Sequence, residues 1–140
     1  MMNLQKLRPL QNILDQCHQF TQYSGVRPYG VALIIAGVDQ KGGSIYVTDP
    51  SGTYVSYAAV AIGAGSEEVT DFLEKNYNTD IGLEEAAALA TAAINLKSEK
   101  KDNAKHVKMS WVKLGKKILE KIPESEIEKF SKIAKEKFPN

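Results

Sequence analysis

The spacing of apolar residues near the N-terminus predicts an amphipathic helix. Five of these residues recur at intervals of three and four, which places them on one stripe of a helix. They are Leu4, Leu7, Leu10, Leu14 and Cys17. Because proline is tolerated best in a first turn and glycine often ends a helix, we expect a firm helix from Pro9 to about Tyr23, with Gly25 as its stop. Cys17 lies on this stripe and is interpreted as a packed residue, not a nucleophile.

The next stretch predicts three strands joined by tight turns. Tyr29–Val38 is a continuous apolar run of strand length, typical of a strand buried on both faces. Ser44–Thr48 alternates apolar and polar residues. The turn Asp49–Gly52 places Asp, Pro and Gly where a type I turn prefers them, and it leads into the strand Thr53–Ile62. The pattern predicts a three-stranded antiparallel meander.

A glycine pair precedes the first helix of the second half. Gly63 and Gly65 lead into a helix that Ser66 is expected to cap, with Glu67 and Glu68 near the positive end of its dipole. The pair lacks the third glycine of the dinucleotide fingerprint and the lysine of the P-loop, so phosphate binding is not favoured. The expected buried stripe is Val69, Phe72, Leu73 and Tyr77.

The rest of the chain predicts an alanine-rich helix, two short strands and a final helix. The first of these helices spans Leu83–Lys97, and the strands span His106–Leu114 and Ile118–Ile122. The closest helix packing is expected along Ala86, Ala90 and Ala93. The final helix begins near Pro123 and buries a typical amphipathic stripe. That stripe is Ile127, Phe130, Ile133, Ala134 and Phe138.

The element order indicates an α+β fold. A helix, three strands, two helices, two strands and a last helix suggest a layered sandwich, with helices on one or both faces of a five-stranded sheet. A chain of 140 residues has the size of one domain, so we expect a single domain over residues 1–140.

Composition narrows the class of protein. The chain is 43% hydrophobic and 25% charged, with a net charge of +1, which is typical of a soluble globular protein. Val31–Val38 is its longest strongly apolar run and is far shorter than the roughly 20 residues of a bilayer-spanning helix. Without a signal-peptide pattern, we expect a cytoplasmic protein that does not enter a membrane.

Charge is unevenly distributed but does not indicate a nucleic-acid site. Residues 1–96 carry five basic and ten acidic groups, whereas residues 97–140 carry thirteen lysines and seven acidic groups. The C-terminal lysines alternate with glutamates in helical register, which favours a solvated helix face over a basic binding patch.

No motif for catalysis or metal binding is present in the sequence. A single cysteine, Cys17, and two histidines, His18 and His106, are too few for a zinc shell of these ligands. No serine or threonine has a histidine in a context that would activate it. We therefore expect no cofactor, no metal and no catalytic residue.

Three blocks of sequence carry a resemblance to a known family. GVRPYGVALIIAGVD spans Gly25–Asp39, DPSG spans Asp49–Gly52, and AIGAG spans Ala61–Gly65. In this order and spacing the chain resembles the second half of proteasome α-type subunits, and the resemblance weakens after Lys97. The motif residues are Gly25, Arg27, Pro28, Tyr29, Gly30, Gly37, Asp49, Pro50, Ser51, Gly52, Gly63 and Gly65.

The resemblance implies a fold similar to the sandwich of N-terminal-nucleophile hydrolases, of which about one sheet and its helices are encoded here. Within the motif, Pro28 is expected to hold Arg27 extended at the strand entry, and Gly30 to permit close backbone approach. Arg27 is also a candidate for a subunit contact.

The resemblance further implies a non-catalytic chain. The related β-type subunits use a threonine freed at the mature N-terminus, whereas this sequence begins Met1-Met2, and Thr48 and Thr53 are internal. The family's N-terminal half holds the gating segment and the pocket for activator tails, so these functions are not carried over to any residue here.

Three hypotheses follow. The first is a structural subunit of the proteasome α ring, or the C-terminal half of a split or truncated one, with α- and β-type subunits or a separate N-terminal half as partners. The second is a stand-alone truncated paralogue that self-associates through an uncovered sheet or acts in assembly. The third is a threonine peptidase, which would require a processed N-terminus.

Overall fold

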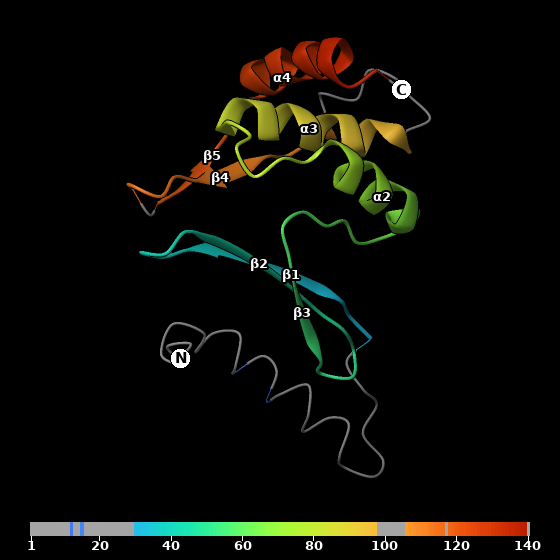
Figure 1. Cartoon of the computed structure of the whole chain (residues 1–140), viewed down its shortest axis with the longest axis vertical. Helices are drawn as coiled ribbons and strands as arrows, with labels where there is room; N and C mark the ends of the chain where they lie inside the picture. The colour runs from blue at the N-terminus through green and yellow to red at the C-terminus, as the bar shows by residue number, and fades with distance from the viewer. Residues whose placement is uncertain (1–11, 13–14, 16–29, 98–105, 117, 140) are drawn as a thin grey trace. The chain divides into compact units, whose positions relative to one another are not determined.

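The computed structural model describes residues 12, 15, 30–97, 106–116 and 118–139, and it divides into two compact units (Figure 1). One unit comprises residues 1–37 and 42–58, and the other comprises residues 38–41 and 59–140. The helix predicted over Pro9–Tyr23 lies largely outside the described residues, as do Gly25 and the block Arg27–Tyr29.

The first unit contains the predicted meander. Its strands are β1 (Leu33–Val38), β2 (Gly43–Thr48) and β3 (Tyr54–Tyr57), in the order β1-β2-β3. β2 and β3 are antiparallel, with Ile45 opposite Tyr57 and Thr48 opposite Tyr54. The connection between β1 and β2 is too short for the crossover that parallel strands need. The three-stranded meander is therefore confirmed.

The third strand is shorter than predicted. β3 ends at Tyr57, whereas the apolar pattern continues to Ile62. In the second unit, Ala59 and Ala61 pack against a cluster formed by the buried residues Leu73, Leu89 and Ala93. The apolar residues after Tyr57 thus supply helix packing instead of strand pairing, and the prediction of a strand to Ile62 was wrong for this reason.

The sheet exposes apolar side chains, although its first strand has the pattern of a strand that is buried on both faces. Leu33 and Ile34 of β1 are exposed, and so is every residue of β3, where Val55 has an exposed fraction of 53%. The alternation of side chains places Ile45, Val47, Val55 and Tyr57 on one face. An apolar strand shows what can be buried, not what covers it, and this exposure agrees with the expectation that the sheet lacks a covering layer within this chain.

The second unit is built around three helices. They are α2 (Ser66–Asn76), α3 (Leu83–Leu96) and α4 (Glu124–Lys137), and α3 lies between the other two (Figure 1). Leu73 of α2 is buried, and Val69, Phe72 and Tyr77 pack around it, as the stripe predicted.

The start of α2 differs from the prediction. Gly65 is the N-cap residue, with φ of 75°, and no side chain caps the helix. Ser66 is already the first helical residue, so the expectation that it caps the helix was wrong. Glu67 and Glu68 do lie in the first turn, where their negative charges interact favourably with the positive end of the helix dipole.

Only part of the predicted alanine line packs in α3, since Ala93 is buried as expected. Ala88 and Ala92 are buried in the cluster shared with α4, while Leu89 and Ala93 are buried beside α2. Ala90, which was expected at the closest approach, is exposed. Ala90 was wrongly placed because alanines lie on almost every side of this helix, so the pattern alone does not tell which of them are buried.

The last two strands form a separate sheet. β4 (Ser110–Val112) and β5 (Leu119–Lys121) are an antiparallel pair, shorter than predicted, and they do not join the first three strands in one five-stranded sheet. The final helix confirms its predicted stripe, since Ile127, Phe130 and Ala134 are buried in the core.

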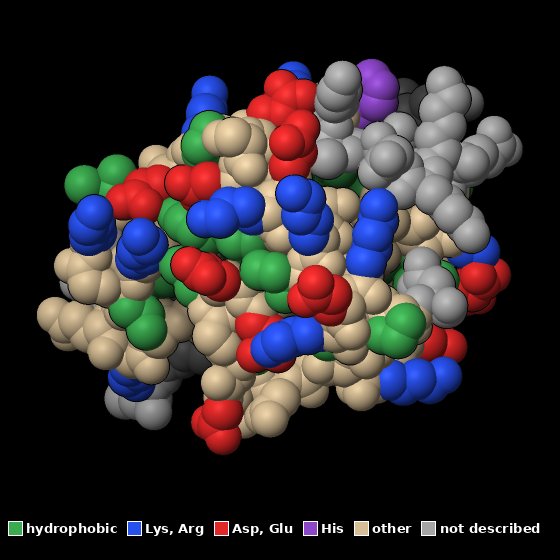
Figure 2. Space-filling view, turned by 90° about the horizontal axis from the view of Figure 1, so that it is seen from above, with side chains coloured by type: hydrophobic (Ala, Val, Ile, Leu, Met, Phe, Trp, Pro, Cys, Tyr) green, Lys and Arg blue, Asp and Glu red, His purple; other side chains and the backbone are tan. Residues whose placement is uncertain are grey.

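Charged residues are mixed on the surface above α4. Figure 2 shows lysines and acidic side chains interspersed over the face seen from above. In α4 itself, Glu128, Lys129 and Lys132 are exposed. This mixture agrees with a solvated helix face. Among the described residues, no helix combines the length and the hydrophobicity needed to cross a bilayer.

Candidate functional site

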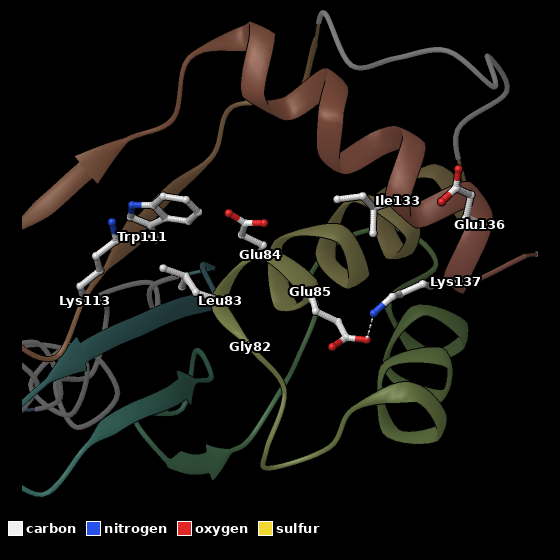
Figure 3. A pocket seen from close by; sticks show the side chains of 9 residues that line it. All are labelled: Gly82, Leu83, Glu84, Glu85, Trp111, Lys113, Ile133, Glu136 and Lys137. Carbon is white, nitrogen blue, oxygen red and sulfur yellow. Dashed lines mark hydrogen bonds and ion pairs between the residues drawn. The ribbon is translucent and has the colours of Figure 1, made fainter.

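The second unit carries a surface hollow of about 590 Å³ (Figure 3). Its walls come from the start of α3, the end of β4 and the last turns of α4. The lining residues are Gly82, Leu83, Glu84, Glu85, Trp111, Lys113, Ile133, Glu136 and Lys137. The hollow therefore combines an apolar wall with charges of both signs.

One wall is fixed by contacts across the β4–β5 hairpin. Trp111 lies opposite Glu120, and its indole Nε1 donates a hydrogen bond of 2.9 Å to Glu120 Oε2. Lys113 Nζ lies 3.5 Å from the same oxygen and 5.1 Å from the centre of the Trp111 ring. The indole ring also lies beside the ring of Phe130, with 6.0 Å between the two centroids. These contacts hold the indole at the edge of the hollow.

Glu120 is the charged centre of this hairpin. The hydrogen bond from Trp111, then the one from Lys116, lower the pKa of the Glu120 carboxyl. Because hydrogen bonds to the ionised form stabilise it, Glu120 stays charged at neutral pH and keeps both lysines near the turn.

The carboxylates of the hollow differ in their partners. Glu85 Oε1 is paired with Lys137 Nζ at 2.8 Å, a contact between the start of α3 and the end of α4. Within the described residues, the side chains of Glu84 and Glu136 have no hydrogen bond or ion pair. Figure 3 shows the Glu84 side chain between Trp111 and Ile133 in this view. The hollow can therefore accept a cationic group beside an apolar one.

Sequence patterns did not single out this hollow. Trp111 was predicted only as part of the strand His106–Leu114, and Glu84 only as part of the helix Leu83–Lys97. The one available signal was that Trp111 is the only tryptophan of the chain. In the part of the chain that the structure describes, no three His, Cys, Asp or Glu residues come together as they would around a metal ion.

The predicted turn motif is closed by Asp49. Oδ1 of Asp49 accepts hydrogen bonds from the backbone N–H groups of Ser51 and Thr53, at 2.8 and 3.2 Å, and from the Ser51 hydroxyl at 2.5 Å. Oδ2 accepts one from the Thr53 hydroxyl at 2.6 Å. The backbone N–H of Gly52 donates to the Asp49 carbonyl at 3.1 Å, as in a β-turn. The side-chain hydrogen bonds from Ser51 and Thr53 lower the pKa of Asp49 to about 2.

The glycines of the motif have different roles. Gly52, Gly63 and Gly65 have positive φ angles of 86°, 111° and 75°, a region that favours glycine. At Gly30 and Gly37 an added Cβ would meet nothing within 4 Å. The close backbone approach expected at Gly30 is therefore not seen among the described residues.

The predicted motif residues do not converge on the hollow. Asp49, Pro50, Ser51 and Gly52 form a turn of the first unit, whereas Gly63 and Gly65 lead into α2 of the second. The first group forms a turn that reverses the chain, and the second group forms the start of a helix. The roles of Gly25, Arg27, Pro28 and Tyr29 fall on residues that the structure does not describe.

A family model and several similar proteins all relate this chain to proteasome subunits. Residues 2–112 match the family model described as proteasome subunit. The chain is 45% identical over 109 residues to the proteasome subunit alpha of Pyrobaculum aerophilum, covering 78% of this chain and 44% of that protein. It is 38% identical over 125 residues to the proteasome subunit alpha of Archaeoglobus fulgidus, covering 89% and 50%. For the proteasome subunit alpha of Saccharolobus islandicus the identity is 48% over 84 residues, covering 60% and 35%.

The matches cover most of this chain but only part of each relative. The chain spans about half the length of the curated relatives it matches, or less. The matched region includes β1 to β3, α2, α3 and β4, while β5 and α4 lie beyond residue 112.

Proposed function

The chain belongs to the proteasome subunit family, and from that premise we propose that it serves as a non-catalytic structural subunit of an α ring. The observation that carries this proposal is the match to proteins named proteasome subunit alpha, at 38 to 48% identity over 84 to 125 residues. The chain would contribute the C-terminal part of an α-type subunit, folded as one domain over residues 1–140. Its partners would be α- and β-type subunits in a cytoplasmic, peptide-degrading particle.

The exposed sheet supports the need for a partner. Val55 and Tyr57 of β3 lie on one apolar face, and both are exposed. Exposed apolar patches of this kind mark surfaces that other chain segments cover. In the sandwich proposed for the family, the covering layer would be a second sheet, supplied by the remainder of an α-type subunit.

A non-catalytic role is supported by the two internal threonines that a peptidase hypothesis would invoke. Thr48 is 1% exposed, which withdraws its hydroxyl from substrate. Thr53 donates its hydroxyl hydrogen bond to Asp49. Neither has the free N-terminal amine that activates a threonine nucleophile. A peptidase would show turnover of fluorogenic peptides by the purified chain, and we expect none.

Co-assembly tests the structural role. The chain is co-expressed with archaeal β-type subunits, with and without the N-terminal half of the P. aerophilum α subunit, and particles are isolated through a tag on this chain. We expect β subunits to co-purify in a ring-shaped particle seen by electron microscopy. Val55→Asp should reduce incorporation, because it places a charge on the apolar face, whereas Gln40→Asp in an exposed turn should not. A chain that never joins β subunits in either condition would contradict the proposal.

The same exposed face favours one second candidate function. A stand-alone protein could cover its sheet with another copy of itself. It would form a stable small oligomer that does not add β subunits, so the co-assembly experiment separates the two functions.

A further inference from the structure

The third strand, β3, forms an open edge of the sheet in the first unit. It pairs with β2 on one side, and no strand of the described sheet lies on its other side. All four of its residues are exposed, so its two faces are open as well. The strand contains no charged residue and no proline, which are residues that native edge strands use to discourage pairing. β3 therefore has the properties of an edge that accepts another strand.

The turn between β2 and β3 shows which backbone groups of β3 point inward. The backbone N–H of Asp49 donates a hydrogen bond of 3.1 Å to the Thr53 carbonyl, and this pair continues the register of the two strands. Hydrogen-bonded pairs alternate along an antiparallel ladder with pairs that are not hydrogen-bonded. Counting in steps of two from Thr53, Val55 and Tyr57 therefore direct their N–H and C=O groups toward β2.

The alternate residues of β3, Tyr54 and Ser56, direct their backbone groups to the open edge. In the described part of the chain, neither residue has a backbone hydrogen bond outside the β2–β3 pair. Each of them therefore offers one donor and one acceptor to another strand. The opposite edge, β1, is less suited to pairing, because Gly37 weakens a strand and Ile35 and Val38 are already half-buried.

We infer that β3 of one copy of this chain pairs antiparallel with β3 of a second copy. The twofold axis passes beside Val55, which faces Val55 of the second copy, and Tyr54 faces Ser56 on either side. In this register every open N–H meets an open C=O, an apolar side chain meets its own kind at the centre, and no like charges are opposed. The contact is isologous, so it closes at two copies. It uses the strand edge and not the apolar face, and it does not rest on the proposed function.

Amide hydrogen exchange of the purified full chain tests this pairing residue by residue. Exchange is measured by NMR at a low concentration and at one where sedimentation velocity shows mostly dimer. Tyr54 and Ser56 should exchange roughly tenfold more slowly in the dimer, because their N–H groups are then hydrogen-bonded between copies. Val55 and Tyr57, which bond to β2, should be protected at both concentrations. A chain that stays monomeric at the highest concentration, or a dimer in which Tyr54 and Ser56 exchange as in the monomer, would overturn the inference.

A disulfide between copies tests the register. Val55→Cys, in a chain that also carries Cys17→Ser, should cross-link two copies under mild oxidation, because facing residues of a pair without hydrogen bonds have Cα atoms about 4.5 Å apart. Ser56→Cys in the same background is the matched control. It is exposed as well, but it faces Tyr54 and lies more than about 7 Å from Ser56 of the second copy, which is beyond disulfide reach. Equal cross-linking at the two positions would contradict the register.

A proline tests the role of the open backbone groups. Ser56→Pro removes one outward N–H from each copy but no hydrogen bond to β2, a position that edge strands tolerate. It should weaken association by roughly tenfold or more in sedimentation velocity. Ser56→Thr keeps the N–H and should associate as the wild type does. Circular dichroism melts show whether each variant is folded, and the exchange pattern and the cross-link decide the question if Ser56→Pro is not. A folded Ser56→Pro variant that associates normally would refute edge pairing.

Discussion

At the scale of single residues, Asp49 accounts for the shape of one whole turn. Four hydrogen bonds from Ser51 and Thr53 converge on its carboxylate, two from backbone N–H groups and two from hydroxyls. They lower its pKa from an ordinary value of 3.8 to about 2. The turn residues of DPSGT therefore do more than permit chain reversal, because they keep Asp49 ionised.

This pKa shift predicts how the turn responds to acid. A carboxyl group with a lower pKa in the folded chain contributes stability that is present above the unfolded pKa and lost as pH falls through the folded value. The contribution of Asp49 should therefore be complete above about pH 5 and disappear between about pH 4 and pH 2. Asp49→Asn should lower the urea midpoint at pH 7 and have little effect near pH 2. Asp80→Asn, at an exposed aspartate, is the control, and an equal effect of Asp49→Asn at both pH values would contradict the assignment.

Gly65 offers a second prediction at this scale. Its φ of 75° is costly for any residue with a Cβ, and that Cβ would lie 2.9 Å from Cε of Lys97. The lysine side chain, which pairs with Glu68, can move, so the backbone sets the cost. Gly65→Ala should lower the free energy of unfolding by about 1–2 kcal/mol. Gly43→Ala, where φ is not positive and space is open, should stay within about 0.5 kcal/mol in the same urea titration. Equal effects of the two substitutions would show that Gly65 is not constrained.

At the scale of elements, the packing of α3 against α4 rests on small side chains. Ala88 is fully buried and Ala92 nearly so, which lets the two helices approach closely. Ala88→Leu would force several extra carbon atoms into this contact and should cost about 1–3 kcal/mol of unfolding free energy. Ala90→Leu makes the same chemical change at an exposed position and should cost less than about 0.5 kcal/mol. A thermal or urea melt that ranks these two variants in the reverse order would refute the observed helix face.

The same helix shows which structural features could be predicted from the sequence and which could not. Composition and length predicted α3 within one residue at its end, because alanine favours helix and Gly82 precedes it. The buried side was predicted only in part: Ala93 is buried as expected, but alanines lie on almost every side of the helix, so the pattern did not exclude Ala90. The sheet gave a related result: alternation and turn residues located β1, β2 and β3, but the end of β3 was decided by the packing of Ala59 and Ala61. The hollow was missed since Glu84, Trp111 and Ile133 come from three separate elements.

At the scale of the whole molecule, the main question is what covers the exposed sheet. The chain spans about half of its relatives, and its first unit carries apolar residues on open strands. Both edges of the meander, β1 and β3, also have backbone groups without a neighbouring strand in the described sheet. Another polypeptide segment can satisfy side chains and backbone together, whereas water can hydrate only the backbone.

The exposed apolar face predicts the effect of adding the N-terminal half of the P. aerophilum α subunit to the purified chain. The added segment should bury the apolar face that includes Val47 and Val55, lower the fluorescence of a bound hydrophobic dye and slow amide hydrogen exchange in β1 to β3. Val55→Asp should prevent these changes, because a carboxylate on a covered face would be desolvated without a partner. Lys121→Asp introduces the same side chain at an exposed position of the second unit and should leave them intact. If exchange in the three strands is unchanged by the added half, the rest of the family fold does not cover this sheet, and self-association becomes the better explanation of its composition.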